Sequence, residues 1–407
     1  MALIGRLLGK LMARGRLTLI AADGSRETYG PGGSDEHLTV RFTDNRVGFD
    51  IVRNPRLGFG EAYMNGRLVI EEGTILGLLE MVVGANRWED GGERRQSISS
   101  GRVAALKSLF RRNPATRSRK NVAHHYDLSD ELYRLFLDSD RQYSCAYFTD
   151  PGNDLDQAQA DKKAHIAAKL HLKPGQKVLD IGCGWGGTAL YLNKVAGVEI
   201  LGVTLSEEQL KVARRRAEEA GVADRVKFEL VDYRHVTGNF DRIVSIGMFE
   251  HVGAAHYGEF FHTCRNLLAK DGVMLLHTIG RLGTEGPPDP FTDKWIFPGY
   301  HLPSLSGMCA ASEPLRLMVS DVEILRLHYA YTLRHWLTRA EAARAEIVKL
   351  YDERFYRLWE FYLAGGIVMF ETGAACNFQI QYVRDRDALP ITRDYMAEAE
   401  ARYRALA

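Results

Sequence analysis

The sequence predicts an α/β protein with a doubly wound, mostly parallel sheet of seven strands and a smaller N-terminal α+β domain. From about residue 121 onward, apolar runs of strand length alternate with helical stretches. One of these runs passes directly into a glycine-rich turn at 182–187. The chain before residue 121 differs, because its short strand candidates are separated by Gly, Pro and Asp.

Length and composition limit the possible classes. A chain of 407 residues is too long for one ordinary core. The 53 basic and 52 acidic residues nearly balance, so we expect no nucleic-acid partner. Five scattered cysteines without a CxxC pair indicate neither a disulfide framework nor a metal site. With no apolar run of about 18 residues and no signal peptide, we expect a cytoplasmic protein that meets the inner face of a membrane peripherally.

The expected N-terminal domain covers residues 1–100. Residues 1–16 have an amphipathic helical pattern with basic but no acidic residues. Such a helix can lie in a membrane interface or pack on its own domain, and both alternatives stay open. After it we expect short strands at Leu17–Ala21, Leu38–Phe42 and Val47–Val52. The run Gly66–Ile70 follows, and then an apolar helix near 74–85.

Residues 101–120 are expected to form a basic linker, because they hold seven Lys and Arg residues, no acid and an Asn-Pro pair. Such a segment can be a solvated linker. It can also contact anionic lipid headgroups, each basic residue contributing about 1 kcal/mol near the surface.

The expected catalytic domain covers residues 121–407. Six of its strand candidates precede a helical block at 338–364, and a seventh follows at 373–383. The six are Val178–Ile181, Glu199–Thr204, Val226–Val231, Arg242–Ile246, Val273–Thr278 and Val322–Leu327. Helices are expected between them, for example at Ser206–Ala220 and Tyr257–Leu268.

The glycine-rich turn predicts a cofactor site. An apolar strand ends in Asp180, and Gly182, Gly184 and Gly187 follow in Gly-x-Gly-x-x-Gly spacing before a helix. A nicotinamide site would need an acid at the end of the second strand, where this chain has Thr204, Leu205 and Ser206. Asp180 would also repel a pyrophosphate. It suits a ligand with a sulfonium and an ammonium group, so we predict S-adenosylmethionine (SAM).

Later strand ends complete this site. Gln209, one turn into the second helix, can reach a ribose hydroxyl. Tyr233, just after the third strand, can cover the adenine ring or simply pack in the core.

The reaction site is expected where the strand order reverses, beyond the carboxyl ends of the strands. Glu250 follows the fourth strand and His277 ends the fifth, so both should face the transferable methyl group. An ordinary hydrogen-bonded pair is the alternative. The polar-aromatic segment 142–148 contains Cys145, which can be a site residue or a small buried side chain.

Together these segments resemble the cyclopropane fatty acid synthase family, which includes the mycolic acid cyclopropane synthases. The likeness covers essentially all of 121–385. The matching segments are His125–Asp127, Tyr143–Tyr147, Asp180–Gly187, Gly202–Ser206, Phe240–Ser245, Met248–Gly253, His277–Gly280, Asp293–Gly299 and His328–Tyr329. It extends to Gly58–Asn65 in the N-terminal unit of the phospholipid-acting branch.

The resemblance implies an enzyme that transfers the methyl carbon of SAM to a cis double bond of a membrane phospholipid and forms a cyclopropane ring. It implies a bicarbonate ion as base, and a homodimer. The implied bicarbonate contacts are Cys145, Glu250, His277, the backbone at Ile279, and Tyr329. The implied cofactor contacts are Tyr143, Ser144, Gly182, Gly184, Thr204, Leu205, Gln209 and Tyr233, beside Asp180.

Two other functions stay open at this stage. A same-fold enzyme can use the same carbocation to make methylene or methyl-branched chains, the latter with a reductase partner. A non-catalytic lipid carrier is the second alternative. The N-terminal domain would bind lipid in each case, and the helical block with Trp295–Pro298 could hold the acyl chain or form ordinary core.

Overall fold

A computed structural model of the chain describes Ile4, Met12 and residues 14–32, 36–84, 87–89 and 128–406. The expected basic linker, most of the expected amphipathic helix and the segment His125–Asp127 lie outside these residues. The described chain divides into two compact units. Unit 1 comprises residues up to 95 together with Asp289–Pro298 and Tyr329–Ala375, and unit 2 comprises the remainder.

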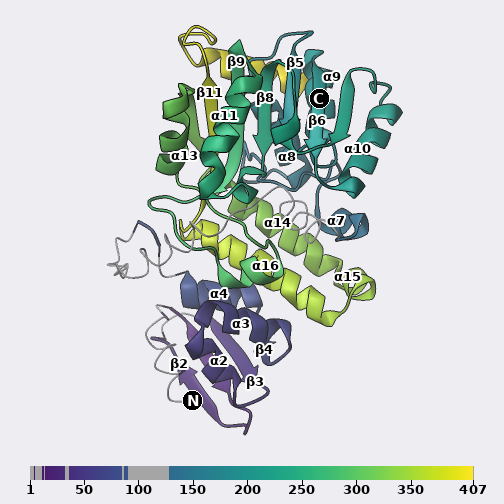
Figure 1. Cartoon of the computed structure of the whole chain (residues 1–407). Helices are drawn as coiled ribbons and strands as arrows, with labels where there is room; N and C mark the ends of the chain where they lie inside the picture. Colours follow the sequence, from purple (N-terminus) through teal and green to yellow (C-terminus); the bar gives the residue numbers. More distant parts are fainter. Residues whose placement is uncertain are drawn as a thin grey trace. The chain divides into compact units, whose positions relative to one another are not determined.

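Unit 2 is built on a seven-stranded sheet in the order β10-β11-β9-β8-β5-β6-β7 (Figure 1). Only β11 runs against its neighbours. The strands are β5 (Lys177–Ile181), β6 (Glu199–Thr204), β7 (Val226–Leu230), β8 (Phe240–Ile246), β9 (Leu268–Gly280), β10 (Met318–Ile324) and β11 (Cys376–Val383). This confirms the predicted doubly wound, mostly parallel sheet.

Helices cover both faces of this sheet, which gives three layers. One apolar core lies beneath α8 (Leu155–Lys169), α9 (Gly187–Ala196), α10 (Glu207–Glu219) and α17 (Asp394–Ala405). The other lies beneath α11 (Tyr257–Leu267) and α13 (Leu305–Ser312). A short helix, α7 (Asp130–Phe136), precedes the first strand of the sheet. The strand residues alternate between the two cores, as Val244 and Ile243 do.

The strand order places the functional site. β5 pairs with β6 on one side and with β8 on the other, so the chain reverses its direction of winding at β5. Ligands bind beyond the carboxyl ends of the strands at such a point, because the loops there diverge and leave a crevice.

Unit 1 contains a four-stranded sheet in the order β2-β1-β3-β4. Its strands are β1 (Arg16–Ile20), β2 (Arg26–Tyr29), β3 (His37–Phe42) and β4 (Leu68–Glu72). Its helices are α2 (Val47–Arg53), α3 (Pro55–Met64), α4 (Ile75–Val83), α12 (Pro290–Trp295), α15 (Arg344–Leu350), α16 (Glu353–Glu371) and most of α14 (His328–Ala342).

The later segments of unit 1 pack on its N-terminal part. The α16 helix lies against α3 and α4. The guanidinium of Arg334 donates to Glu80 on α4 and to Glu371 on α16, at 2.7 Å in each case. Residues 289–298 and 329–375 therefore do not belong to the compact unit that holds the parallel sheet, unlike the single domain expected over 121–407.

One local expectation is wrong. Val47–Val52 forms the helix α2, because Val47 and Ile51 are buried one turn apart while Phe49 is 63% exposed. Val47, Phe49 and Ile51 stand at alternate positions in the sequence, which is also the pattern of a half-buried strand. The expected helical block at 338–364 is confirmed as helical and consists of the end of α14, all of α15 and most of α16. The α16 helix begins where Asp352 accepts a hydrogen bond from Phe355 N–H at 2.6 Å.

Among the described residues, none of the helices combines the length and the apolar character needed to cross a bilayer.

Candidate active site

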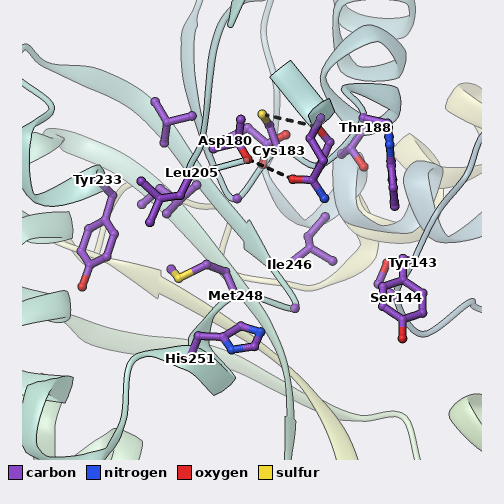
Figure 2. A pocket seen from close by; sticks show the side chains of 18 of the residues that line it. Tyr143, Ser144, Asp180, Cys183, Thr188, Leu205, Tyr233, Ile246, Met248 and His251 are labelled. Atoms are coloured by element: carbon purple, nitrogen blue, oxygen red, sulfur yellow. Dashed lines mark hydrogen bonds between the residues drawn. The ribbon is translucent and has the colours of Figure 1, made fainter. Parts of the chain in front are cut away.

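The glycine turn after β5 forms the floor of a pocket in unit 2 (Figure 2). Gly182, Gly184 and Gly186 adopt left-handed backbone angles, with φ of 85°, 53° and 82°. This lets the chain turn sharply from β5 into α9. A Cβ added at Gly184 would meet no atom within 4 Å, whereas one at Gly182 would lie 3.0 Å from Met248 Cβ. Backbone at the turn thus borders open space that a ligand can approach.

All nine predicted cofactor residues line this one pocket. They come from the segment before α8 and from the ends of β5, β6 and β7; they are Tyr143, Ser144, Asp180, Gly182, Gly184, Thr204, Leu205, Gln209 and Tyr233. Figure 2 shows Tyr233 on one side and Tyr143 with Ser144 on the other, with Met248 between them. The nine residues therefore lie together around one pocket, and their role as cofactor contacts stays a prediction.

Asp180 places a buried carboxyl group in the wall of the pocket. Its side chain is buried, and nothing in the described part of the chain hydrogen-bonds its Oδ2. Burial raises the pKa of this carboxyl to about 7, while the charge of Lys162 opposes the shift. A buried carboxylate oxygen that lacks a donor is costly unless a ligand supplies one. An ammonium group would supply it.

The ribose and adenine ends are shaped by β6 and β7. Thr204 Oγ1 donates to Gln209 Oε1 at 2.9 Å, which fixes the Gln209 amide at the pocket wall. Tyr233 lines the pocket, and its ring also meets Phe260 edge-on with centroids 5.4 Å apart. Both alternatives for Tyr233, pocket wall and core packing, are therefore present in one side chain.

A buried lysine supports the segment that borders the pocket before α8. Lys162 Nζ donates to Gln142 Oε1 at 2.7 Å and to Ser144 Oγ at 2.8 Å. Burial lowers the pKa of Lys162 to about 7. Tyr143 also packs against Tyr133, and the two rings meet edge-on with their centroids 5.3 Å apart.

Sequence reasoning missed several residues that line the pocket. They include Arg141, Gln142, Trp185, Thr188, Met248, His251 and His256. Gln142, Met248 and His251 stand inside segments that the sequence had marked, so their spacing to predicted residues was the available signal. His251 is partly buried, and its surroundings of low polarity lower its pKa to about 4, so it is neutral at physiological pH.

The residues expected to hold the base lie elsewhere at this edge of the sheet. Cys145, Glu250, His277 and Ile279 are in unit 2 but not among the residues that line the pocket. Glu250 Oε1 accepts the Ile279 N–H at 2.7 Å, and the Gly247 N–H donates to the His277 carbonyl at 2.9 Å. Glu250, His277 and Ile279 are thus tied together where β8 and β9 end.

Glu250 resembles Asp180 in its burial. Its Oε2 is buried, and no group of the described residues donates to it. Burial raises the pKa of Glu250 to about 7. Cys145 is completely buried and its thiol donates to the Ala146 carbonyl at 3.4 Å. Tyr329 belongs to unit 1, and its part in the reaction site stays a prediction.

The doubly wound sheet, the acidic strand end, the glycine turn and the pocket at the switch point define a SAM-dependent methyltransferase. Solved structures agree. The cyclopropane synthase MmaA2 from Mycobacterium tuberculosis is 32% identical, covers 65% of this chain and 97% of its own, and superposes with a TM-score of 0.62. The mycolic acid cyclopropane synthase CmaA1 complexed with SAH and CTAB is 35% identical, with the same coverage and TM-score. A coclaurine N-methyltransferase, 20% identical with a TM-score of 0.64 over 76% of this chain and 97% of its own, shows the same fold.

Sequence comparison gives the family. The model of the mycolic acid cyclopropane synthetase family matches residues 113–380, so the chain belongs to that family. A model of a domain of unknown function matches residues 10–87.

Two curated relatives are informative. A protein named probable fatty acid methyltransferase from Pseudomonas putida is 41% identical over 68% of this chain and 73% of its own. The cyclopropane-fatty-acyl-phospholipid synthase of Escherichia coli K12 is 45% identical over 59% of this chain and 61% of its own. The match therefore spans less than two thirds of the E. coli enzyme. The predicted family, fold and enzyme class are confirmed.

Proposed function

We propose that this protein transfers the methyl carbon of SAM to a cis double bond in an acyl chain of a membrane phospholipid and closes a cyclopropane ring. The observation that carries the proposal is the single pocket lined by all nine predicted cofactor residues, with the buried Asp180 oxygen at its floor. The E. coli relative, by its name, acts on phospholipid acyl chains. We further propose that the protein works at the inner face of the membrane as a homodimer.

The reaction consists of one alkylation and one proton loss. The π electrons of the alkene attack the sulfonium methyl, a C–C bond forms, the C–S bond breaks, and SAH leaves. A base then takes a proton from the new methyl group of the cation, and the ring closes. The protein must align the alkene with the C–S bond and keep water from the cation.

The residues at the ends of β8 and β9 fit a small oxyanion as this base. Bound bicarbonate would supply a proton acceptor that is not part of the chain. Glu250, with a pKa of about 7, can keep a proton and donate it in a hydrogen bond to an anion. Burial lowers the pKa of His277 well below its usual value, so a neutral imidazole faces the same region. We propose that Glu250, His277, Cys145 and Tyr329 hold the anion together with the backbone at Ile279.

One observation favours a second function. The P. putida relative is named for fatty acid methylation rather than for ring formation. The same cation gives a methylene chain after a hydride shift and loss of a proton, and a reductant then gives a methyl branch. The complete set of expected catalytic and cofactor residues argues against the third alternative, a non-catalytic lipid carrier.

The test is a product analysis. The pure full-length protein is incubated with SAM and vesicles of cis-unsaturated phospholipid, and the released acyl chains are analysed. A ring and a methylene chain both add one CH₂, so proton NMR and resistance to ozonolysis must identify the ring. A product cleaved by ozone, or a branched product formed only with a reductant, would support the second function instead.

Variants connect the product to the site. Glu250→Gln should lower turnover by about 100-fold, within the range for a group that serves proton transfer, while SAM binding stays near normal. Glu259→Gln is a matched control, because Glu259 is a half-exposed carboxylate on α11 paired with His256 at 3.0 Å. Near-normal turnover of Glu250→Gln would contradict its assignment.

A further inference from the structure

A row of polar side chains crosses three neighbouring strands beside the proposed base site. His277 on β9 lies opposite Gln379 on β11, and Gln379 lies opposite Glu323 on β10. His277 and Gln379 are buried, with exposed fractions of 1% and 0%. Lys169, in the last turn of α8, lies over this row and is also buried.

Lys169 determines how Gln379 is oriented. Its Nζ donates to Gln379 Oε1 at 2.8 Å and pairs with the carboxylate of Glu323. Burial opposes ionisation of Glu323, but the hydrogen bond from His165 and the charge of Lys169 outweigh it and lower its pKa to about 2. Burial lowers the pKa of Lys169, but the paired carboxylate of Glu323 opposes this shift and favours the ammonium form, which has donors only. Gln379 must therefore present its oxygen to Lys169.

The amide group of Gln379 then decides the protonation of His277. With its oxygen facing Lys169, Gln379 presents Nε2 to His277 Nδ1 at 3.1 Å. Since an amide NH₂ can only donate, Nδ1 must be the acceptor, and the ring proton must be on Nε2. A doubly protonated ring would place two donors face to face, which agrees with the strongly lowered pKa of His277.

Asn377 is consistent with this assignment. Its Nδ2 lies 2.9 Å from His277 Nε2, and its buried Oδ1 meets no donor from the described residues. A half-turn of the Asn377 amide places the oxygen against Nε2–H and satisfies both groups. The His277 Nε2–H donor is then available either to Asn377 or to a bound anion.

We propose that Lys169 is a positioning residue that, through Gln379, holds His277 in the neutral Nε2–H tautomer. Only the consequence of this tautomer rests on the proposed function. His277 would then offer a fixed N–H donor to an oxyanion, and its Nδ1 could not take the substrate proton. The tautomer itself follows from contacts within unit 2.

The sharpest test exchanges the Gln379 amide for a carboxylate. In Gln379→Glu, a nearly isosteric change, the new group accepts from both neighbours, so the His277 proton should move to Nδ1. In Lys169→Met, Gln379 can turn, and both tautomers should appear. Protein labelled with ¹⁵N-histidine reports which ring nitrogen carries the proton, and the His277 signals are assigned from their loss in His277→Gln.

Gln176→Glu is the control. Gln176 lies just before β5, and its side-chain Oε1 accepts a hydrogen bond from the Lys173 N–H at 2.9 Å, which a carboxylate oxygen can also accept. This variant should leave the His277 signals unchanged. SAM binding, measured by calorimetry, should stay near the wild-type value in Gln379→Glu and Lys169→Met, because neither residue lines the cofactor pocket.

The outcomes separate the two proposals. Turnover should fall about 10–100-fold in Gln379→Glu and Lys169→Met, the range seen when a group that orients a ligating histidine is lost. A His277 that keeps Nε2–H in Gln379→Glu, or a changed tautomer with unchanged turnover, would overturn the positioning role. If the wild-type protein formed no ring, the proposed function would fail, and the nitrogen signals would still decide the tautomer.

Discussion

The affinity for SAM should depend on pH through Asp180. Burial raises the pKa of this carboxyl to about 7, above the ordinary 3.8, so the free protein holds a neutral acid at low pH. The ammonium group of SAM needs the carboxylate, and binding must therefore weaken as pH falls through about 7. For a group with this pKa, the ionised fraction rises from about one tenth at pH 6 to about one half at pH 7, so Kd should fall about 5-fold.

The size of the interaction follows from its chemistry. Loss of a hydrogen bond to a charged group costs about 1.5–3 kcal/mol, so Asp180→Asn should weaken SAM binding about 10- to 150-fold at pH 7.5. It should also remove the rise in affinity between pH 6 and pH 7. Above pH 8, affinity should decline again as the ligand's own amine, with a pKa of about 8, loses its proton.

Isothermal calorimetry across this range is the assay, with 5′-methylthioadenosine as the control ligand. It lacks the amino acid, so its Kd should be flat with pH. In buffers of different ionisation enthalpy, SAM binding near pH 6.5 should release a proton. If Asp180→Asn kept the wild-type slope, another group would be titrating, and Lys162, with a pKa lowered to about 7 by burial, would be the first to examine.

Two further predictions concern stability. In Glu250→Gln, the free energy of unfolding should exceed the wild-type value by up to about 3 kcal/mol at pH 8 and equal it near pH 4. Burial raises the pKa of Glu250 in the folded state from 4.5 to about 7, so the wild type loses stability as pH rises through that window. If urea titrations showed the same difference between variant and wild type at every pH, this prediction would be wrong. Gly60→Ala should lower the unfolding free energy by about 1–3 kcal/mol, because its Cβ would lie 2.7 Å from the Phe361 ring; an unchanged urea midpoint would mean that α3 shifts freely.

The cofactor pocket could be predicted from the sequence because its residues follow strand ends. Asp180, Thr204 and Tyr233 each stand at or just after a parallel strand, and parallel strands end at one edge of a sheet. Arg141 and Trp185 also line the pocket, but the loop before α8 and the exact path of the glycine turn carry no periodic signal.

The organisation of unit 1 could not be predicted in the same way. Its core joins α3 and α4 to α12 and α16, which are separated by more than two hundred residues in sequence. Local patterns report burial of a segment but not its partner. Phe361, for example, packs on Phe291 with ring centroids 4.7 Å apart, an ordinary core contact that its helical spacing alone leaves ambiguous. An acyl-binding role of these helices stays a prediction.

The α8 helix buries polar side chains that its sequence pattern alone would not lead us to expect in a core. A helix packed on a sheet normally buries an apolar stripe, and α8 does so with residues such as Ile166 and Ala167, yet it also buries Gln159, Lys162, His165 and Lys169. Burying polar groups is costly unless each finds a partner. Here the first two hold the backbone and the hydroxyl of Ser144 in the cofactor wall, and the last two bind Glu323 beside the row that reaches the base site. One helix thus ties the two halves of the proposed reaction centre together. This explains why α8 buries these polar side chains beside its apolar ones: apolar residues at the four positions would leave both halves without support.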